Sequence, residues 1–171
     1  MTTLVNVLVD DPRFNWNDIS IELQKAISFY QNFGVDLVFL PRLREPFLGI
    51  NLHFCQPNGS YAYPSQKKAK ITLSDWFYRP NERWGVIAHE LGHAIFNLPD
   101  HYEGASDQVP TSEPCIMNSP NETIFCSNCL EIINEYIQQQ ERRKNAIKAI
   151  ALVGIPILVG FSLLALSSKK K

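Results

Sequence analysis

The residues with the clearest capacity for chemistry are two histidines and a glutamate in the stretch His89-Glu90-Leu91-Gly92-His93. Residues four apart lie on one face of a helix, so His89 and His93 can present two imidazole nitrogens to one metal ion. A catalytic zinc also needs a third protein ligand, an open position for water, and a carboxylate that accepts a proton without binding the metal. Glu90 fits the last role. The pattern predicts a zinc-dependent hydrolase, and the simpler alternative is a chance pair of histidines on a helix.

A third ligand must come from the chain that follows His93. Asn97 can end the helix, because asparagine tolerates the left-handed conformation found at helix C-termini, and Pro99 prevents the helix from continuing. Asp100 and His101 follow at once, and either could reach the metal. On these residues alone, both assignments stay open.

Three cysteines follow this region, Cys115, Cys126 and Cys129, whereas Cys55 precedes it. In a cytosolic protein a Cys-x-x-Cys pair such as Cys126 and Cys129 is more often metal-binding or redox-active than a structural disulfide. The pair therefore indicates a possible second metal site. A disulfide or a pair of inert thiols is the alternative.

These motifs resemble those of the metzincin zinc peptidases. The metzincin pattern is HExxHxxGxx, then His or Asp as third ligand, and later a turn with a methionine below the metal. The matching residues here are His89, Glu90, His93, Asp100 and Met117. Asn97 stands in place of the expected glycine, one residue later, so the third ligand is displaced by one residue as well. A related bacterial family that cleaves immunoglobulin A has a similar longer spacing, with an acidic residue at the place of Asp100.

A narrower resemblance is to the archaemetzincins, in which a cysteine follows the third ligand and a CxM turn and FCxxC come later. The segments 115–117 and 125–129 match the last two parts, and His101 occupies the place of the first cysteine. The resemblance covers residues 84–129. It implies a catalytic zinc on His89, His93 and Asp100, with Met117 packed below it, and a structural Cys₃His zinc site on His101, Cys115, Cys126 and Cys129. The competing assignment gives His101 to the catalytic zinc and leaves three cysteines, with Cys55 a distant fourth.

The elements that must position these residues can be predicted from hydrophobic periodicity. Apolar runs predict strands at residues 4–9, 35–40, 49–54 and 69–74, and a turn-rich loop at 56–64. An amphipathic helix that ends at Gly34 joins the first two strands and indicates a parallel pair with a crossover helix. A second helix, about 82–96, carries the metal motif, and another begins at Cys126. The fold class predicted is α/β (α+β, metzincin-like), with a mixed sheet of four to five strands.

Charge is distributed unevenly along the chain. Residues 1–141 carry 9 Lys/Arg against 17 Asp/Glu, a net charge of −8, whereas residues 142–171 carry 7 Lys/Arg and no acid, +7. The basic part encloses 18 uncharged residues, 149–166, which would form a helix of roughly 27 Å. Basic residues flank this run on both sides, as in membrane spans. We therefore expect a zinc peptidase domain at 1–141 and a single C-terminal transmembrane anchor at 142–171.

The combined expectation is a membrane-anchored zinc metallopeptidase that hydrolyses peptide bonds, with Glu90 as general base. The start of the chain shows no signal peptide, so the catalytic domain is expected in the cytosol. An extended substrate is expected to add to the sheet edge at residues 71–74. No nucleic-acid partner is expected. The alternatives are a non-catalytic, membrane-anchored zinc-binding module and a zinc hydrolase acting on something other than protein.

Overall fold

A computed structural model of the chain describes residues 1–41, 49–56, 60–104 and 108–167, with side chains as far as residue 150. The chain divides into two compact units, Met1–Ile133 and Asn134–Lys171. The first unit contains every strand of the described residues and all the candidate site residues.

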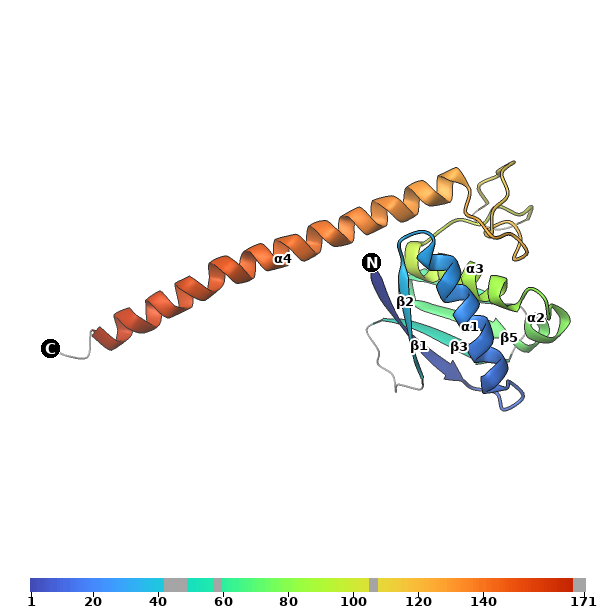
Figure 1. Ribbon diagram of the computed structural model, residues 1–171, viewed down its shortest axis with the longest axis horizontal. Helices are drawn as coiled ribbons and strands as arrows, with labels where there is room; N and C mark the ends of the chain where they lie inside the picture. The colour runs from blue at the N-terminus through green and yellow to red at the C-terminus, as the bar shows by residue number, and fades with distance from the viewer. Residues whose placement is uncertain (42–48, 57–59, 105–107, 168–171) are drawn as a thin grey trace. The chain divides into compact units, whose positions relative to one another are not determined.

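Five strands form one mixed sheet in the order β2-β1-β3-β5-β4. The strands are β1 (Thr2–Val9), β2 (Asp36–Pro41), β3 (Ile50–Cys55), β4 (Tyr61–Tyr63) and β5 (Lys68–Thr72). The first four in spatial order run parallel (Figure 1). Strand β4 pairs antiparallel with β5. All six residues of the central strand β3 are buried, the polar Asn51 and His53 included, as expected of a strand inside a parallel sheet. The prediction of a mixed sheet of four to five strands is confirmed.

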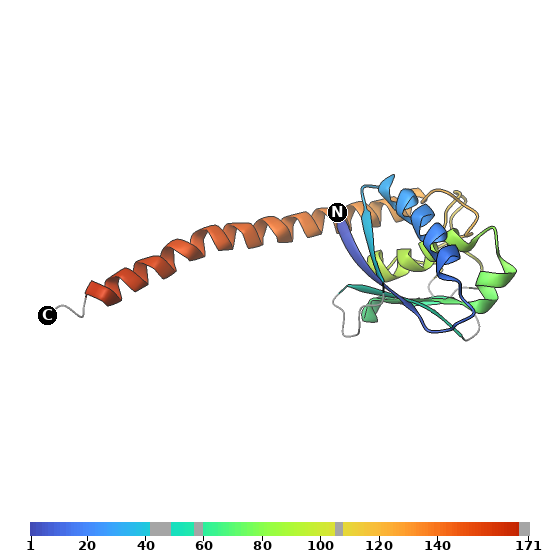
Figure 2. The ribbon, with the colours of Figure 1, turned by 60° about the horizontal axis from the view of Figure 1, so that its bottom comes forward.

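Two long helices of the first unit, α1 (Trp16–Gln31) and α3 (Arg83–Phe96), pack against one face of this sheet and against each other (Figure 2). α1 connects the parallel strands β1 and β2 and is the predicted crossover helix. Two shorter helices, η1 (Pro64–Gln66) and α2 (Leu73–Tyr78), flank β5. The apolar core is formed by residues that include Val5, Val7, Leu52 and Ile71 from the sheet and Ile19, Leu23, Ile87 and Leu91 from the helices.

The sheet edge beside the metal motif differs from the expectation. Part of the predicted loop 56–64 forms strand β4, which pairs with β5 and becomes the edge. The predicted strand 69–74 ends at Thr72, because the next residue begins α2. The Thr72 amide donates a hydrogen bond to Ser60 Oγ (3.1 Å), and the Ser60 amide donates to Asp75 Oδ2 (2.7 Å). The prediction that residues 71–74 form the free edge is therefore wrong.

The second unit consists of the greater part of α4 (Ser127–Ser167), a helix of 41 residues, and the residues after it. Across the part of the chain that the structure describes, no helix is long and apolar enough to cross a membrane. Almost all of the predicted span 149–166 lies among residues 151–167, whose side chains are outside the described part, as are the flanking lysines 169–171.

Candidate metal centres

The end of helix α3 determines where the chain goes after His93. Asn97 adopts the left-handed conformation, with φ 57° and ψ 41°, and its amide donates to the carbonyl of His93 (2.9 Å). The Leu98 amide donates to the Gly92 carbonyl across the same turn. The prediction that Asn97 ends the helix in this way is confirmed. The chain therefore turns back and brings Asp100 toward the face of α3 that carries both histidines.

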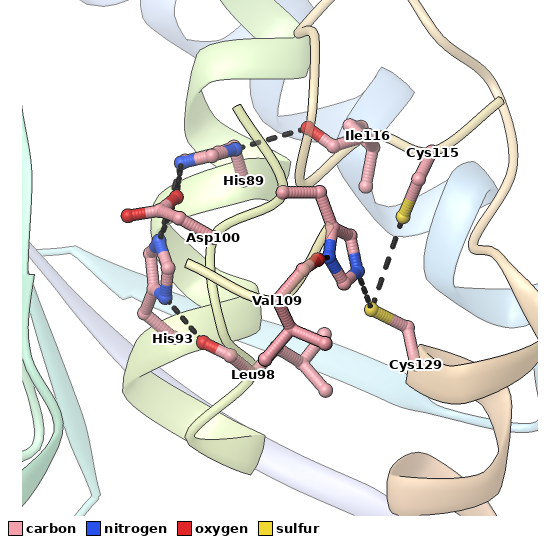
Figure 3. Close-up of polar contacts among 9 residues, drawn as sticks. His89, His93, Leu98, Asp100, Val109, Cys115, Ile116 and Cys129 are labelled. Carbon is pink, nitrogen blue, oxygen red and sulfur yellow. Dashed lines mark hydrogen bonds and ion pairs between the residues drawn. The ribbon is translucent and has the colours of Figure 1, made fainter. Parts of the chain in front are cut away.

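His89, His93 and Asp100 come together as a first cluster (Figure 3). Asp100 Oδ1 lies 3.2 Å from His89 Nε2 and 3.1 Å from His93 Nε2, and the two Nε2 atoms are 3.2 Å apart. A tetrahedral zinc with ligand atoms at about 2.0–2.1 Å separates those atoms by about 3.3–3.4 Å. The spacing of the three atoms matches three corners of such a site.

Backbone carbonyls set the orientation of both imidazole rings. His89 Nδ1 lies 2.9 Å from the Ile116 carbonyl and His93 Nδ1 lies 2.6 Å from the Leu98 carbonyl. A carbonyl only accepts hydrogen bonds, so each Nδ1 carries a proton, and Nε2, which faces the other ring and Asp100, is the nitrogen left to bind a metal ion. Two lone pairs and a carboxylate that converge in this way fit a cation.

The charge state of Asp100 also suits a metal ligand. Burial raises the pKa of this carboxyl, but the hydrogen bonds and charges of His89 and His93 lower it by more, so the pKa lies well below its ordinary value. The carboxylate is therefore the stable form, and it is the form that binds metal ions.

Glu90 lies beside the first cluster without joining it. The residue is 5% exposed, and among the described residues its Oε2 atom has no hydrogen-bond partner. Burial raises the pKa of Glu90 to about 7, although the charges of His89 and His93 lower it. A buried carboxyl with one unpaired oxygen and a pKa near neutrality has the properties of a general base.

Two hollows meet over the first cluster and Glu90. Their volumes are about 420 and 340 Å³, and both are lined by Ser60, His89, Glu90 and Tyr102. The larger is completed by Asp75, Arg79, Val86, Asn118 and Pro120, and the smaller by Tyr61, Ala62, Pro64, His93 and Asp100. A third hollow, about 540 Å³ and lined from α1 and the start of α3, has no acid, histidine or cysteine in its wall. Of these three hollows in the described part of the chain, the first two have histidine and glutamate side chains in their walls.

His101, Cys115, Cys126 and Cys129 form a second cluster, and all four are buried. His101 Nε2 lies 3.1 Å from Cys129 Sγ and 3.2 Å from Cys126 Sγ, and the Sγ atoms of Cys115 and Cys129 are 3.8 Å apart. Thiolates at about 2.3 Å from a tetrahedral zinc are separated by about 3.8 Å. All four cysteines of the chain are free thiols, and Cys55, at the end of β3, belongs to neither cluster.

The thiols of the second cluster are electrostatically coupled. A hydrogen bond joins the Cys115 and Cys129 thiols. This bond lowers the pKa of Cys115 to about 5, whereas the same bond and burial raise the pKa of Cys129. Neighbouring thiolates repel one another, so several of them are stable together only beside a cation. The donor set of one imidazole and three thiols fits zinc.

A turn at residues 115–119 serves both clusters. The amides of Asn118 and Ser119 donate to the Cys115 carbonyl at 2.8 and 3.1 Å, which closes the turn. Met117 is fully buried, and its Sδ atom lies 2.9 Å from the point where a Cβ atom of Gly92 would be. Met117 therefore packs against α3 at Gly92, and a larger residue at that position would force the methionine side chain to shift.

The structure places each of the predicted metal ligands in one of two clusters, and Asp100 and His101 belong to different clusters. Asp100 joins His89 and His93, whereas His101 joins the cysteines. The walls of the hollows were not predicted: Ser60, Asp75 and Arg79 carry no local sequence signal. Tyr102 directly follows His101, and this position could have indicated it.

Comparison with known proteins yields structural matches only. No known protein-family model matches the sequence, and no curated protein sequence does. The fold is similar to the crystal structure of archaemetzincin from Methanopyrus kandleri, with a TM-score of 0.55 and 14% sequence identity, over 80% of this chain and 96% of that chain. The structure of myroilysin matches with a TM-score of 0.46 and 16% identity, over 78% and 90%. The fold is thus similar to that of archaemetzincin. At this level of identity the similarity concerns the fold alone.

Proposed function

We propose that this chain is a zinc metallopeptidase that hydrolyses peptide bonds. His89, His93 and Asp100 would hold the catalytic zinc, and Glu90 would be the general base. The observation that carries the proposal is the position of Glu90, whose unpaired Oε2 is buried beside three converging ligand atoms where two hollows meet.

Each residue has a defined task in this reaction. Zinc, when bound, supplies a water of lowered pKa and polarises the substrate carbonyl. Glu90 takes the proton of the attacking water and returns it to the leaving amine. The carbonyls of Ile116 and Leu98 keep His89 and His93 in the tautomer that leaves Nε2 free to bind.

The substrate would be an extended peptide that crosses both hollows. Strand β4 is the sheet edge on this side, and Ser60, Tyr61 and Ala62 line the smaller hollow beside His93 and Asp100. An extended peptide can add to such an edge through backbone hydrogen bonds while its side chains enter the hollows. This edge replaces residues 71–74 as the proposed docking strand.

The second cluster would hold a structural zinc. Its four donors are buried and none of them lines one of the three hollows described above. A closed site with a full set of four protein ligands is typical of structural zinc. Total zinc is therefore expected to be two ions per chain.

Residues 142–171 would attach the peptidase domain to a membrane, with the domain in the cytosol. The proposal rests on the uncharged run 149–166 and its basic flanks. Introducing Val153→Lys together with Leu158→Lys should release the full chain from membranes into the soluble fraction, because charges near the centre of a span are costly. Ile147→Lys, outside the run, is the control and should leave the chain in the membrane fraction. Equal partitioning of all three proteins would contradict the anchor.

The peptidase proposal is tested by Glu90→Gln in the full chain, with denatured protein as substrate and zinc content measured in parallel. Turnover should fall by about 10²- to 10⁴-fold while both zinc ions stay bound. The exposed Glu103→Gln is the control and should retain turnover. Retained turnover in Glu90→Gln would refute the general base. No cleavage by the fully zinc-loaded unmodified chain would favour the non-catalytic zinc-binding module.

A further inference from the structure

The two clusters share one short segment of chain. Asp100 belongs to the first cluster and His101 to the second, so a single peptide bond connects them. Figure 3 shows Asp100 directed toward His89 and His93, with Cys115 and Cys129 in the neighbouring cluster. Any displacement of His101 is therefore passed directly to the third ligand of the first cluster.

The turn at residues 115–119 provides a second connection. Cys115 contributes its sulfur to the second cluster, and the next carbonyl, of Ile116, lies 2.9 Å from His89 Nδ1 in the first. The Met117 carbonyl accepts a hydrogen bond from the His101 amide (3.0 Å). The consecutive residues Cys115, Ile116 and Met117 thus connect the two clusters: Ile116 contacts the first, and Cys115 and Met117 contact the second.

The segment that carries Asp100 has little regular structure to hold it. Residues 97–101 belong to no helix or strand. The backbone at Asp100 is tied by its carbonyl, which accepts from the Val109 amide (2.8 Å), and the carbonyl of Val109 in turn contacts His101 Nδ1. The backbone of Asp100 is therefore anchored beside His101, through the same residue, Val109, that contacts the His101 ring.

We propose that the second cluster positions Asp100, so that a metal ion bound by His101 and the three cysteines raises the affinity of the first cluster for zinc. The inference rests on the two-metal assignment of the proposed function and adds an energetic coupling between the sites. Because coupling is reciprocal, zinc in the first cluster raises the affinity of the second by the same factor. A factor of about 5 to 150 is typical of such coupling.

The test compares two substitutions of His101 in the full chain. His101→Ala removes the tether and should lower the zinc affinity of the first cluster by about 5- to 150-fold. His101→Cys supplies a thiolate in place of the imidazole and should restore most of that affinity. Cys55→Ser, a buried cysteine outside both clusters, is the control and should leave the affinity unchanged. Affinity is measured by competition with a chromophoric chelator, and cobalt distinguishes the sites, since only the second gives thiolate-to-cobalt absorption.

The reciprocal test uses His93→Asn, which weakens the first cluster and should lower the cobalt and zinc affinity of the second by the same factor. This variant carries the test alone if His101→Ala does not fold. Unchanged metal affinity of the unsubstituted cluster in a folded variant would overturn the coupling. That result differs from failure of the proposed function, which would appear as an unmodified chain that binds no zinc in the first cluster.

Discussion

The two clusters lie one peptide bond apart and differ in nearly every property that decides what a metal site does. The first has two imidazoles and a carboxylate, with side chains 10–13% exposed at the junction of two hollows. The second has one imidazole and three thiols, all buried, and borders none of the described hollows. Three ligands with access for water favour catalysis, and four closed ligands favour structure. Two metal sites that are neighbours in the chain can therefore be suited to different roles, catalytic and structural, because only one of them is open to water.

The largest effect that tests this comparison is the loss of a first-cluster ligand. His89→Ala should abolish detectable peptide cleavage, because removal of one ligand leaves only His93 and Asp100 to hold the catalytic zinc. The free energy of unfolding in saturating zinc should change far less than in a second-cluster variant. The measurements are turnover and denaturant unfolding on the same preparation. Substantial residual cleavage by His89→Ala would break the assignment of the first cluster as the catalytic site.

The converse substitution tests the second cluster. Cys126→Ala should lower the free energy of unfolding by several kcal/mol, because structural zinc contributes its binding energy to folding. Cys55→Ala removes a buried thiol that belongs to neither cluster and is the control for lost packing. The comparison is measured by denaturant unfolding with and without a zinc chelator. If the chelator destabilised Cys126→Ala as much as the unmodified chain, the stabilising zinc would have to be in the first cluster.

Gly92→Ala should disturb the turn that serves both clusters. An alanine Cβ would lie 2.9 Å from Met117 Sδ and 3.3 Å from Leu98 Cδ1, so the methionine must move. Overpacking of this kind costs about 1–3 kcal/mol. Adding Met117→Ala should cost less in the Gly92→Ala background than alone, because the smaller residue removes the overlap. A double-mutant cycle of unfolding free energies measures the difference, and strict additivity would contradict the contact.

How far the sequence alone could lead depends on how local each feature is. His89, Glu90 and His93 lie on one helix, so their shared face follows from the helical period, and Asn97 ends that helix as its side chain predicts. The choice between Asp100 and His101 was open, because adjacent residues are equally near to a metal in sequence and only the turn at 115–119 separates them in space. Strand β4 escaped prediction since it is three residues long and depends on Ser60, β5 and Asp75 for its pairing.

The smallest expected effect concerns the hydrogen bond between Tyr30 of α1 and the backbone of α3 next to the first cluster. Tyr30 is fully buried, and its hydroxyl donates to the carbonyl of Ala88 (2.6 Å), the residue before His89. Tyr30→Phe removes one buried hydrogen bond and should lower the free energy of unfolding near neutral pH by about 1 kcal/mol. The loss should be smaller than that of Gly92→Ala, since the helix keeps its own backbone bonds.

The pH dependence of the same variant identifies the phenol. Burial raises the pKa of Tyr30 well above its ordinary value of 10.0. Between pH 10 and the raised pKa, the phenol of Tyr30 is deprotonated in the unfolded chain but protonated in the folded chain. The free energy of unfolding therefore falls as pH rises, by about 1.4 kcal/mol per pH unit for this one group. Tyr30→Phe should lack this component and lose less stability between pH 10 and the raised pKa. Tyr78→Phe, at an 88% exposed position, should keep the original slope. An unchanged slope in Tyr30→Phe would show that the phenol ionises equally well in the folded chain, and α3 would then be held without this contact.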